Sequence, residues 1–294
     1  MRFAAVLLVG LAVLLPGAGR AQPASEYRII AIGDFGVGGE FQRSFGEGVR
    51  KFEARNRSNL LLTLGDNDYS ESPTAFRANW ADSFGWARRR GLAVAGVIGN
   101  HDARVQGGRY EFSTLGMRGR YYKRRAGPAE LFLLDSNRID SAQTSWLARS
   151  LAGSKARWKI AVFHHPAYTC GNYWAHPEVV RRWVPLFERH RVVLALSGHE
   201  HNYQRLGPKR GVRYVVHGGG NSWLYPISSC PAGYPRLARG LAEHGFVYLV
   251  VRSNRLDGWA VWPDGTRRDH FAVMQPAAPA KPVRTQVGAA ESAP

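Results

Sequence analysis

The chain has 294 residues and a formal net charge of +18, with 45% hydrophobic, 12% aromatic and 21% charged residues. This balance is typical of a soluble globular protein with a substantial core, and it excludes a disordered chain, a collagen and a coiled coil. The basic residues are scattered in short groups such as Arg88–Arg90, so the charge predicts attraction of anions and no specific nucleic-acid surface.

The two ends of the chain differ from the rest. Residues 1–21 are expected to be a cleaved secretory signal, because an apolar run from Phe3 to Leu15 precedes the small-residue pattern Gly19-Arg20-Ala21. The run is shorter than the ~20 residues that cross a bilayer, which disfavours a membrane anchor. Residues 22–274 are expected to form one domain, and the Ala- and Pro-rich residues 275–294 a disordered tail. We therefore expect a secreted or periplasmic protein.

Within the domain, short apolar runs typical of strands alternate with stretches typical of helices. Strands are expected at Tyr27–Ile32, Asn59–Leu64, Leu92–Ile98, Leu131–Leu134, Lys159–Phe163, Val192–Leu196, Val212–His217, Phe246–Val251 and Gly258–Trp262, and helices at Glu40–Arg57, Thr74–Arg90, Ala142–Leu151 and His176–His190. The alternation predicts parallel sheet at the centre, and the last strands indicate an antiparallel addition. The predicted fold class is α/β, with mixed sheets covered by helices.

Five of the predicted strands end directly before residues that bind metals well. The first four lead to Asp34, Asp66, Asn100 and His164, and the fifth leads to His199 and His201. Because the carboxyl ends of parallel strands open onto a common crevice, we expect these side chains to converge. One strand-terminal Asp is more often a helix cap or turn residue, but five such coincidences, four of them after a glycine, are hard to explain by capping.

Two local spacings extend this set of donors. Tyr69 lies three residues after Asp66, so both can point to one side of a turn. His199 and His201 occupy alternate positions of an extended segment, which places them on one face while Glu200 points away. Two carboxylates, a phenol, an amide oxygen and three imidazoles are too many for one tetrahedral zinc but suit two cations of higher coordination. The sequence therefore predicts a two-metal site.

The ordered motifs GDFG (33–36), GDNDY (65–69), GNHD (99–102), FHHP (163–166) and GHEH (198–201) resemble the signature of the calcineurin-like metallophosphoesterases. Within that superfamily, Asp34-Phe35-Gly36 in place of Asp-x-His, together with Tyr69, resembles the short, tartrate-resistant form of the purple acid phosphatases. The resemblance implies a single-domain β-sandwich of two mixed sheets flanked by helices. It also implies that Asp34, Asp66, Tyr69 and His201 bind Fe(III), and that Asn100, His164 and His199 bind a second divalent ion (iron, zinc or manganese), with Asp66 shared.

The resemblance further implies substrate-side roles for His101 and for His176, whose local motif differs from that of the family. The implied activity is an acid phosphatase that hydrolyses small phosphomonoesters by attack of a metal-bound hydroxide. A phosphodiesterase or nucleotidase using the same site is an alternative, as is a non-catalytic metal- or phosphate-binding export protein. His165 is expected either to support the ligands or to contact substrate. The sequence does not indicate an oligomeric state.

Cys170 and Cys230 are the only cysteines of the chain and can pair in just one way. Because an exported protein enters an oxidising compartment, we expect a disulfide, with two buried free thiols as the alternative. An aromatic group lies near these cysteines and the histidine motifs in sequence, and it is expected either to wall the pocket or to pack around the cysteines: Tyr168, Tyr173, Trp174, Trp223 and Tyr225.

Overall fold

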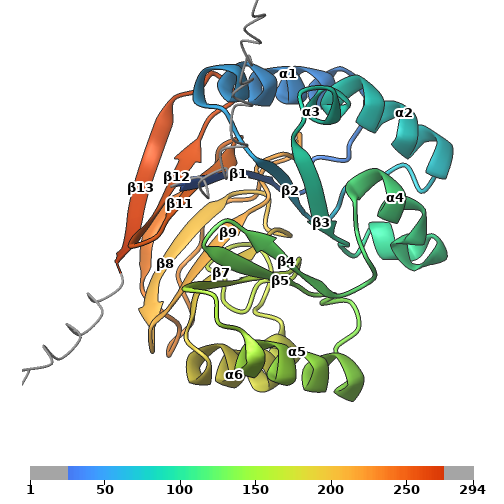
Figure 1. Cartoon of the computed structure of the whole chain (residues 1–294). Coiled ribbons are helices and arrows are strands. Elements are labelled where there is room, and N and C mark those ends of the chain that lie inside the picture. The colour runs from blue at the N-terminus through green and yellow to red at the C-terminus, as the bar shows by residue number, and fades with distance from the viewer. Residues whose placement is uncertain (1–25, 275–294) are drawn as a thin grey trace, which may run out of the picture.

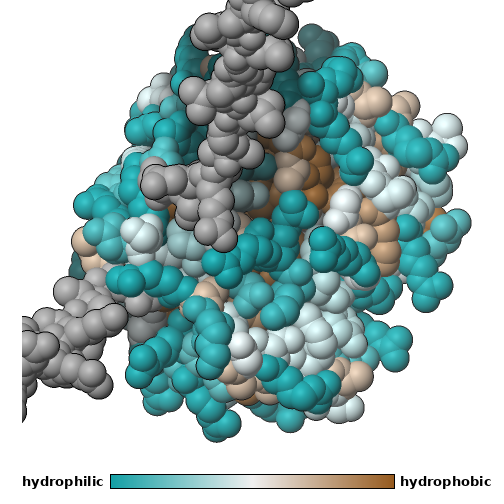
Figure 2. Space-filling view, viewed as in Figure 1, coloured by the Kyte–Doolittle hydropathy of each residue, from teal (hydrophilic) through white to brown (hydrophobic). Residues whose placement is uncertain are grey.

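The computed structural model describes residues 26–274, so the predicted signal (1–21) and the predicted tail (275–294) lie outside the described residues. Two mixed β-sheets lie face to face, with helices on their outer sides (Figure 1). This arrangement confirms the predicted fold class. Among residues 26–274, no helix has the length and apolar character needed to span a bilayer. Hydrophilic residues dominate the face seen in Figure 2.

The first sheet has six strands in the order β13-β12-β11-β1-β2-β3. These are β1 (Glu26–Ile32), β2 (Leu60–Leu64), β3 (Ala93–Val97), β11 (Phe246–Arg252), β12 (Arg255–Val261) and β13 (Arg267–Met274). Strands β1, β2 and β3 are parallel, and β2 is fully buried, as its continuous apolar run predicts. The other three strands pair antiparallel, which confirms the predicted antiparallel addition, although β13 itself was not predicted.

The second sheet has seven strands in the order β10-β8-β9-β7-β6-β5-β4. These are β4 (Tyr122–Ala126), β5 (Ala129–Leu133), β6 (Trp158–Val162), β7 (Val192–Ser197), β8 (Tyr203–Lys209), β9 (Val212–His217) and β10 (Leu237–Leu241). The four central strands β5, β6, β7 and β9 are parallel. Strands β4, β8 and β10 were not predicted, because charged residues, Gly or Pro interrupt their apolar pattern and tertiary pairing decides their structure.

Helices cover the outer side of each sheet (Figure 1). On the six-stranded sheet lie α1 (Gly39–Asn56), α2 (Pro73–Phe84) and α3 (Trp86–Arg89), and on the seven-stranded sheet lie α5 (Ser141–Gly153) and α6 (Val184–Arg189). The helix predicted over Thr74–Arg90 is divided, because α2 ends at Phe84 and Gly85 separates it from α3. The helix predicted over His176–His190 contains a π-helical turn at Val179–Trp183, just before Pro185 removes a backbone donor.

Apolar side chains fill two layers of the molecule. One large cluster combines residues of both sheets, such as Ile30 of β1 and Val162 of β6, with the inner faces of α1 and α2. In this cluster, Phe52 of α1 packs edge-on against Phe246 of β11. A second cluster lies between the seven-stranded sheet and its helices and includes Phe187 of α6. Apolar packing on both faces therefore fixes the strands of the seven-stranded sheet.

Asp269 of β13 links the two sheets at their edge. Its carboxylate accepts hydrogen bonds from the guanidinium of Arg205 on β8, at 2.6 and 3.0 Å, and from the hydroxyl of Tyr203, at 2.7 Å. Burial acts to raise the pKa of Asp269, but Arg205 and Tyr203 outweigh it and hold the pKa below its usual value. The charged carboxylate therefore stabilises the fold above the unfolded-state pKa, and this contribution is lost as the pH falls through the folded-state pKa.

We expect Asp269→Asn to lower the free energy of unfolding by about 2 kcal/mol at pH 7, because hydrogen bonds to a charged group are weakened. The difference from the wild type is expected to shrink below about pH 4, where the wild-type carboxyl also takes up a proton. Urea unfolding at pH 7 and pH 3 measures both values, with exposed Asp82→Asn as the control. An equal difference at the two pH values would contradict this account.

Candidate dinuclear metal centre

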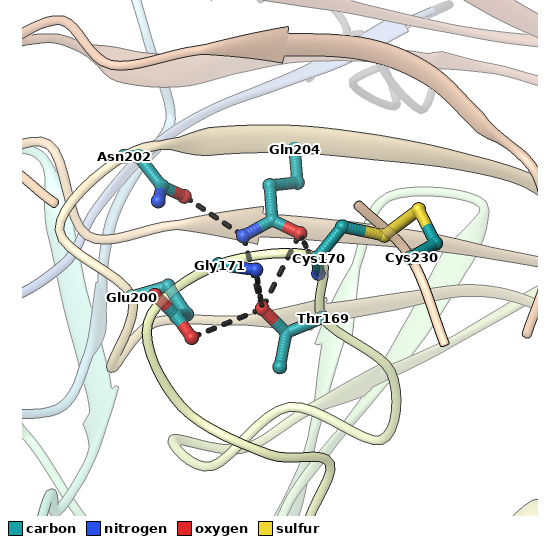
Figure 3. The surroundings of a disulfide bond; sticks show 7 residues. All are labelled: Thr169, Cys170, Gly171, Glu200, Asn202, Gln204 and Cys230. Atoms are coloured by element: carbon teal, nitrogen blue, oxygen red, sulfur yellow. Dashed lines mark hydrogen bonds between the residues drawn. A yellow bond between two sulfur atoms is a disulfide. The ribbon is translucent and has the colours of Figure 1, made fainter. Parts of the chain in front are cut away.

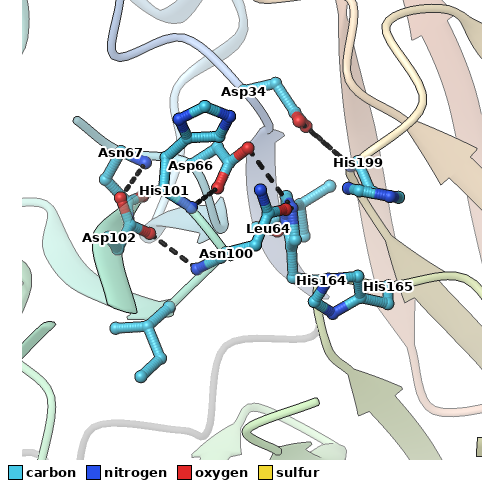
Figure 4. Close-up of polar contacts among 12 residues, drawn as sticks. Asp34, Leu64, Asp66, Asn67, Asn100, His101, Asp102, His164, His165 and His199 are labelled. Carbon is cyan, nitrogen blue, oxygen red and sulfur yellow. Dashed lines mark hydrogen bonds and ion pairs between the residues drawn. The ribbon is translucent and has the colours of Figure 1, made fainter. Parts of the chain in front are cut away.

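The loops after β1, β2, β3, β6 and β7 meet at one edge of the sandwich, and their side chains face each other in Figure 4. Backbone hydrogen bonds join these loops. The N–H of Asp34 donates to the carbonyl of Gly65 at 3.0 Å, and the N–H of Gly198 donates to the carbonyl of His164 at 3.1 Å. A third bond, from Gly220 to Gly33 at 3.1 Å, connects the two sheets. The predicted convergence of strand ends is therefore present.

One half of the donor set surrounds the hydroxyl of Tyr69. This oxygen lies 3.1 Å from Oδ2 of Asp66 and 3.2 Å from Nε2 of His201. The same nitrogen of His201 is 3.5 Å from Oδ1 of Asp34. Asp34 and Asp66 are buried, and their ion-pair partners are His201 and His164. The four residues expected to hold the first cation thus contact one another.

The other half surrounds Nε2 of His164. This nitrogen lies 3.1 Å from Oδ1 of Asn100 and 3.4 Å from Oδ2 of Asp66. The ring of His199 is 5.1 Å from the ring of His164, measured between centroids. Donor atoms of Asp34, Asp66 and His164 all lie within 4.8 Å of one another. Asp66 therefore faces both halves, as expected of a shared ligand.

Backbone carbonyls orient two of the imidazoles. Nδ1 of His164 lies 2.9 Å from the carbonyl oxygen of Leu64, and Nδ1 of His201 lies 2.8 Å from that of Trp223. Because a carbonyl oxygen can only accept, each Nδ1 donates its hydrogen and Nε2 is directed at the carboxylates. This is the arrangement in which proteins hold histidine ligands of metals. Sequence reasoning missed both carbonyls, since a main-chain acceptor has no residue signature.

Three residues of the centre have left-handed backbones, with φ of 62° at Asp34, 50° at Asp66 and 72° at His199. Such conformations are uncommon outside glycine and concentrate at functional sites. Two glycines of the motifs are required because carboxylates of the centre lie where a Cβ would stand. A Cβ at Gly99 would lie 2.1 Å from Oδ1 of Asp66, and one at Gly198 would lie 2.6 Å from Oδ2 of Asp34. The turns therefore place the side chains at a local cost in backbone strain.

The electrostatics of the centre suit cations. Burial disfavours the charged form of Asp66, but the positive charges of His164 and His101 hold its pKa below the usual value. Burial acts to lower the pKa of His164, yet Asp66 and Asp34 raise it to about 10. Burial and the two carboxylates raise the pKa of Tyr69 far above its usual value. Cations bound between these groups would replace the protons of His164 and Tyr69, so the donor set fits a pair of metal ions.

Three further histidines that the sequence singles out, His101, His165 and His176, lie beside this cluster. The backbone N–H of His101 donates to Oδ1 of Asp66 at 2.9 Å, and its ring lies 4.3 Å from that of Tyr69. The ring of His165 is 4.6 Å from that of His199, and its Nδ1 is 2.9 Å from the hydroxyl of Ser136. The ring of His176 is 5.3 Å from that of His165. His176 thus reaches the cluster through His165.

Comparison with known proteins agrees with this geometry. Residues 23–203 match the family model described as calcineurin-like phosphoesterase. The chain belongs to this family. It is 26% identical to the tartrate-resistant acid phosphatase type 5 of Oryctolagus cuniculus, over 84% of this chain and 90% of that protein. The corresponding protein of Rattus norvegicus is also 26% identical, over 85% and 92%. The resemblance to the purple acid phosphatases is thereby confirmed.

Solved structures share the fold of this phosphoesterase. The purple acid phosphatase PPD1 from yellow lupin superposes with a TM-score of 0.70 at 18% identity, covering 85% of this chain and 54% of that one. GAP50, described as the anchor in the inner membrane complex of Plasmodium, gives a TM-score of 0.73 at 15% identity, covering 85% and 89%. At these identities the likeness concerns the fold alone.

A buried pair of carboxyl groups supports the second and third motifs of the phosphoesterase. Asp102 accepts a hydrogen bond from the N–H of Asn67 at 2.8 Å (Figure 4). It also accepts from the N–H of Gly99 at 2.6 Å, and the side-chain amide of Asn67 reaches Glu111 at 2.9 Å. Burial and the charge of Asp66 raise the pKa of Asp102 to about 7, and burial with Asp102 raises that of Glu111 well above its usual value. Sequence reasoning missed Glu111, because it lies in the irregular segment Gln106–Glu111 without a motif.

Glu200 is buried and accepts hydrogen bonds from another loop of the phosphoesterase. The prediction that residues 199–201 are extended is wrong, because the segment bends and His199 has a left-handed backbone with φ of 72°. The carboxylate of Glu200 accepts from the N–H of Tyr173 at 2.6 Å and from the N–H of Asn172 at 2.9 Å. It also accepts from the hydroxyl of Thr169 at 3.1 Å (Figure 3). Cys170 of the same loop forms a disulfide with Cys230, which confirms the predicted pairing. The last histidine motif and the disulfide loop therefore form one unit.

Proposed function

We propose that this phosphoesterase is an exported acid phosphatase that releases orthophosphate from small phosphomonoesters at a centre of Fe(III) and a second divalent ion, namely iron, zinc or manganese. The observation that carries the proposal is the meeting of seven donors from five loops at one edge of the sandwich. The relatives named tartrate-resistant acid phosphatase support an acid phosphatase activity. The disulfide supports export to an oxidising compartment.

In this proposal the two halves of the donor set hold one cation each. Asp34, Tyr69 and His201 would bind Fe(III), Asn100, His164 and His199 would bind the divalent ion, and Asp66 would bind both. The cations, when bound, would supply Lewis acidity that polarises a phosphate group and lowers the pKa of a water molecule. The net positive charge of the chain attracts the anionic ester.

The substrate-side work would fall to histidines of the chain itself. The ring of His101 packs on Tyr69 and is partly exposed, so it is positioned to bind a phosphate oxygen or to pass a proton to the leaving alcohol. His176 would act further out, where its buried Nδ1 has no hydrogen-bond partner among the described residues. His165, which is hydrogen-bonded to Ser136, packs against the ring of His199 and would hold that ring in place.

Metal analysis combined with two parallel assays tests the proposed function. We expect two metal ions per chain, one of them iron, and release of phosphate from a phosphomonoester at acid pH. A bis-ester is expected to be hydrolysed much more slowly. Faster hydrolysis of the bis-ester would favour a phosphodiesterase on the same centre. Stoichiometric metal binding without release of phosphate from either ester would overturn the enzymatic proposal.

Replacement of Tyr69 by phenylalanine is expected to abolish a visible absorption band of the oxidised protein, because the phenolate is the donor of the charge transfer to Fe(III). Tyr69 lies 3.2 Å from His201 and 3.1 Å from Asp66, within the proposed iron site. The matched control is Tyr225→Phe, since Tyr225 stacks on His201 without joining the donor set. An unchanged band in the Tyr69 variant would show that Tyr69 is not an iron ligand.

A further inference from the structure

A cavity of about 420 Å³ lies beside the disulfide. Two segments line it, residues 169–174 and residues 228–231. Tyr173, one of the lining residues, stacks on the ring of His199 with 4.4 Å between centroids and 29° between planes. The cavity therefore begins one aromatic ring away from a proposed metal ligand. Its volume lies in the range of small-molecule sites in proteins.

Both aromatic residues that line this cavity, Tyr173 and Trp174, are exposed. Trp174 is 81% exposed and Tyr173 is 42% exposed, whereas most large apolar side chains of residues 26–274 are buried. Tyr225 stacks on His201 at 4.2 Å, and its hydroxyl lies 3.4 Å from that of Tyr173. Neighbouring exposed aromatic rings can stack on the ring of a ligand. The flat faces of Tyr173 and Trp174 are suited to stacking.

The walls of the cavity are fixed before any ligand arrives. The disulfide joins its two segments, and the N–H of Ser228 donates to the carbonyl of Cys170 at 2.7 Å. Buried Glu200 accepts from the N–H groups of Asn172 and Tyr173, which ties the first segment to the last histidine motif. A preformed wall loses little conformational entropy on binding. The cavity and the metal centre therefore keep a constant relative position.

We propose that residues 169–174 and 228–231 form a ring subsite, which binds the planar aromatic part of a phosphomonoester while its phosphate lies at the metal centre. This inference rests on the proposed phosphatase function. The faces of Tyr173 and Trp174 stack on the ring, and Asn172, Ser228 and Ser229 offer polar groups to its edge. The substrate class is thus aryl or nucleoside phosphates, which share a flat ring linked to a phosphate.

Ester pairs with matched leaving groups test the ring subsite. Adenosine 5′-monophosphate and ribose 5-phosphate release the same type of alcohol with and without a base, and 2-phenylethyl phosphate and 2-cyclohexylethyl phosphate differ only in a flat or puckered ring. We expect kcat/KM to be at least about fivefold higher for the flat-ring member of each pair. The gain should come mainly from a lower KM, because stacking of a ring on an aromatic side chain stabilises the bound substrate. A preference confined to the nucleotide pair would identify a nucleoside as the ring.

Trp174→Ala is expected to bring both ratios close to one. The matched control is Trp262→Ala, because Trp262 lies under the guanidinium of Arg268 and does not line the cavity. Thermal unfolding of both variants checks that the fold is retained. Ratios near one in the wild type, with all four esters hydrolysed, would overturn the ring subsite and leave the phosphatase proposal intact.

A binding measurement separates the ring subsite from turnover. Adenosine 5′-monophosphate is expected to quench the tryptophan fluorescence of the wild type at concentrations where ribose 5-phosphate does not, and this quenching is expected to disappear in Trp174→Ala. If no ester is hydrolysed but this difference is seen, the proposed function fails and the ring subsite stands. Equal quenching by the two phosphates would overturn the subsite.

Discussion

Replacing Asp66 by alanine is expected to remove both cations from the centre and to lower kcat/KM by at least about 1,000-fold, a loss of roughly 4 kcal/mol in transition-state stabilisation. The reason is its position between the two halves of the donor set. Its Oδ2 lies 3.1 Å from the hydroxyl of Tyr69 and 3.4 Å from Nε2 of His164. Metal analysis of the purified variant and phosphate release from a monoester measure the two effects.

The neighbouring acid provides a matched control for this change. Asp68 is also buried, but its carboxylate accepts hydrogen bonds from Ser70 and from the hydroxyl of Tyr110 at 2.9 Å. Asp68→Asn is therefore expected to keep both cations. Loss of a single cation from the Asp66 variant would contradict the assignment of Asp66 as a shared ligand.

Replacement of Cys170 and Cys230 by serine is expected to lower the free energy of unfolding by about 4 kcal/mol, from the chain entropy of a loop of this length. The two residues are 60 positions apart in sequence. Urea unfolding of the double variant and of the wild type measures the difference, and wild type unfolded with a reductant is expected to match the variant. A loss below about 1 kcal/mol would mean that the loop stays closed through other contacts.

The parallel strands were predictable from sequence because they are buried on both faces and read as continuous apolar runs. β2, with the sequence LLLTL, is the clearest case. The strands that pair at the sides of the sheets were harder to find. β4 reads YKRRA and β10 reads LARGL, and exposed charged residues or glycine hide the strand until a neighbour supplies its hydrogen bonds.

The seven proposed ligands were predictable for a related reason, since each one follows an apolar run at a strand end or lies within three residues of such a position. What supports them was not predictable. The carbonyls of Leu64 and Trp223 act through the main chain, and Glu111 is far from the motifs in sequence. The burial of Glu200 depends on the loop of residues 169–173, whose path is a tertiary property.

The proposed ligands come from both sheets, and this affects when the centre can form during folding. Asp34 and Asp66 follow strands of one sheet, whereas His164 and His201 follow strands of the other. In an unfolded chain only sequence neighbours such as Asp66 and Tyr69 lie close together, so the complete donor set requires the long-range pairing of the strands. Since cations would bind the native chain and not the unfolded one, their free concentration would raise the melting temperature.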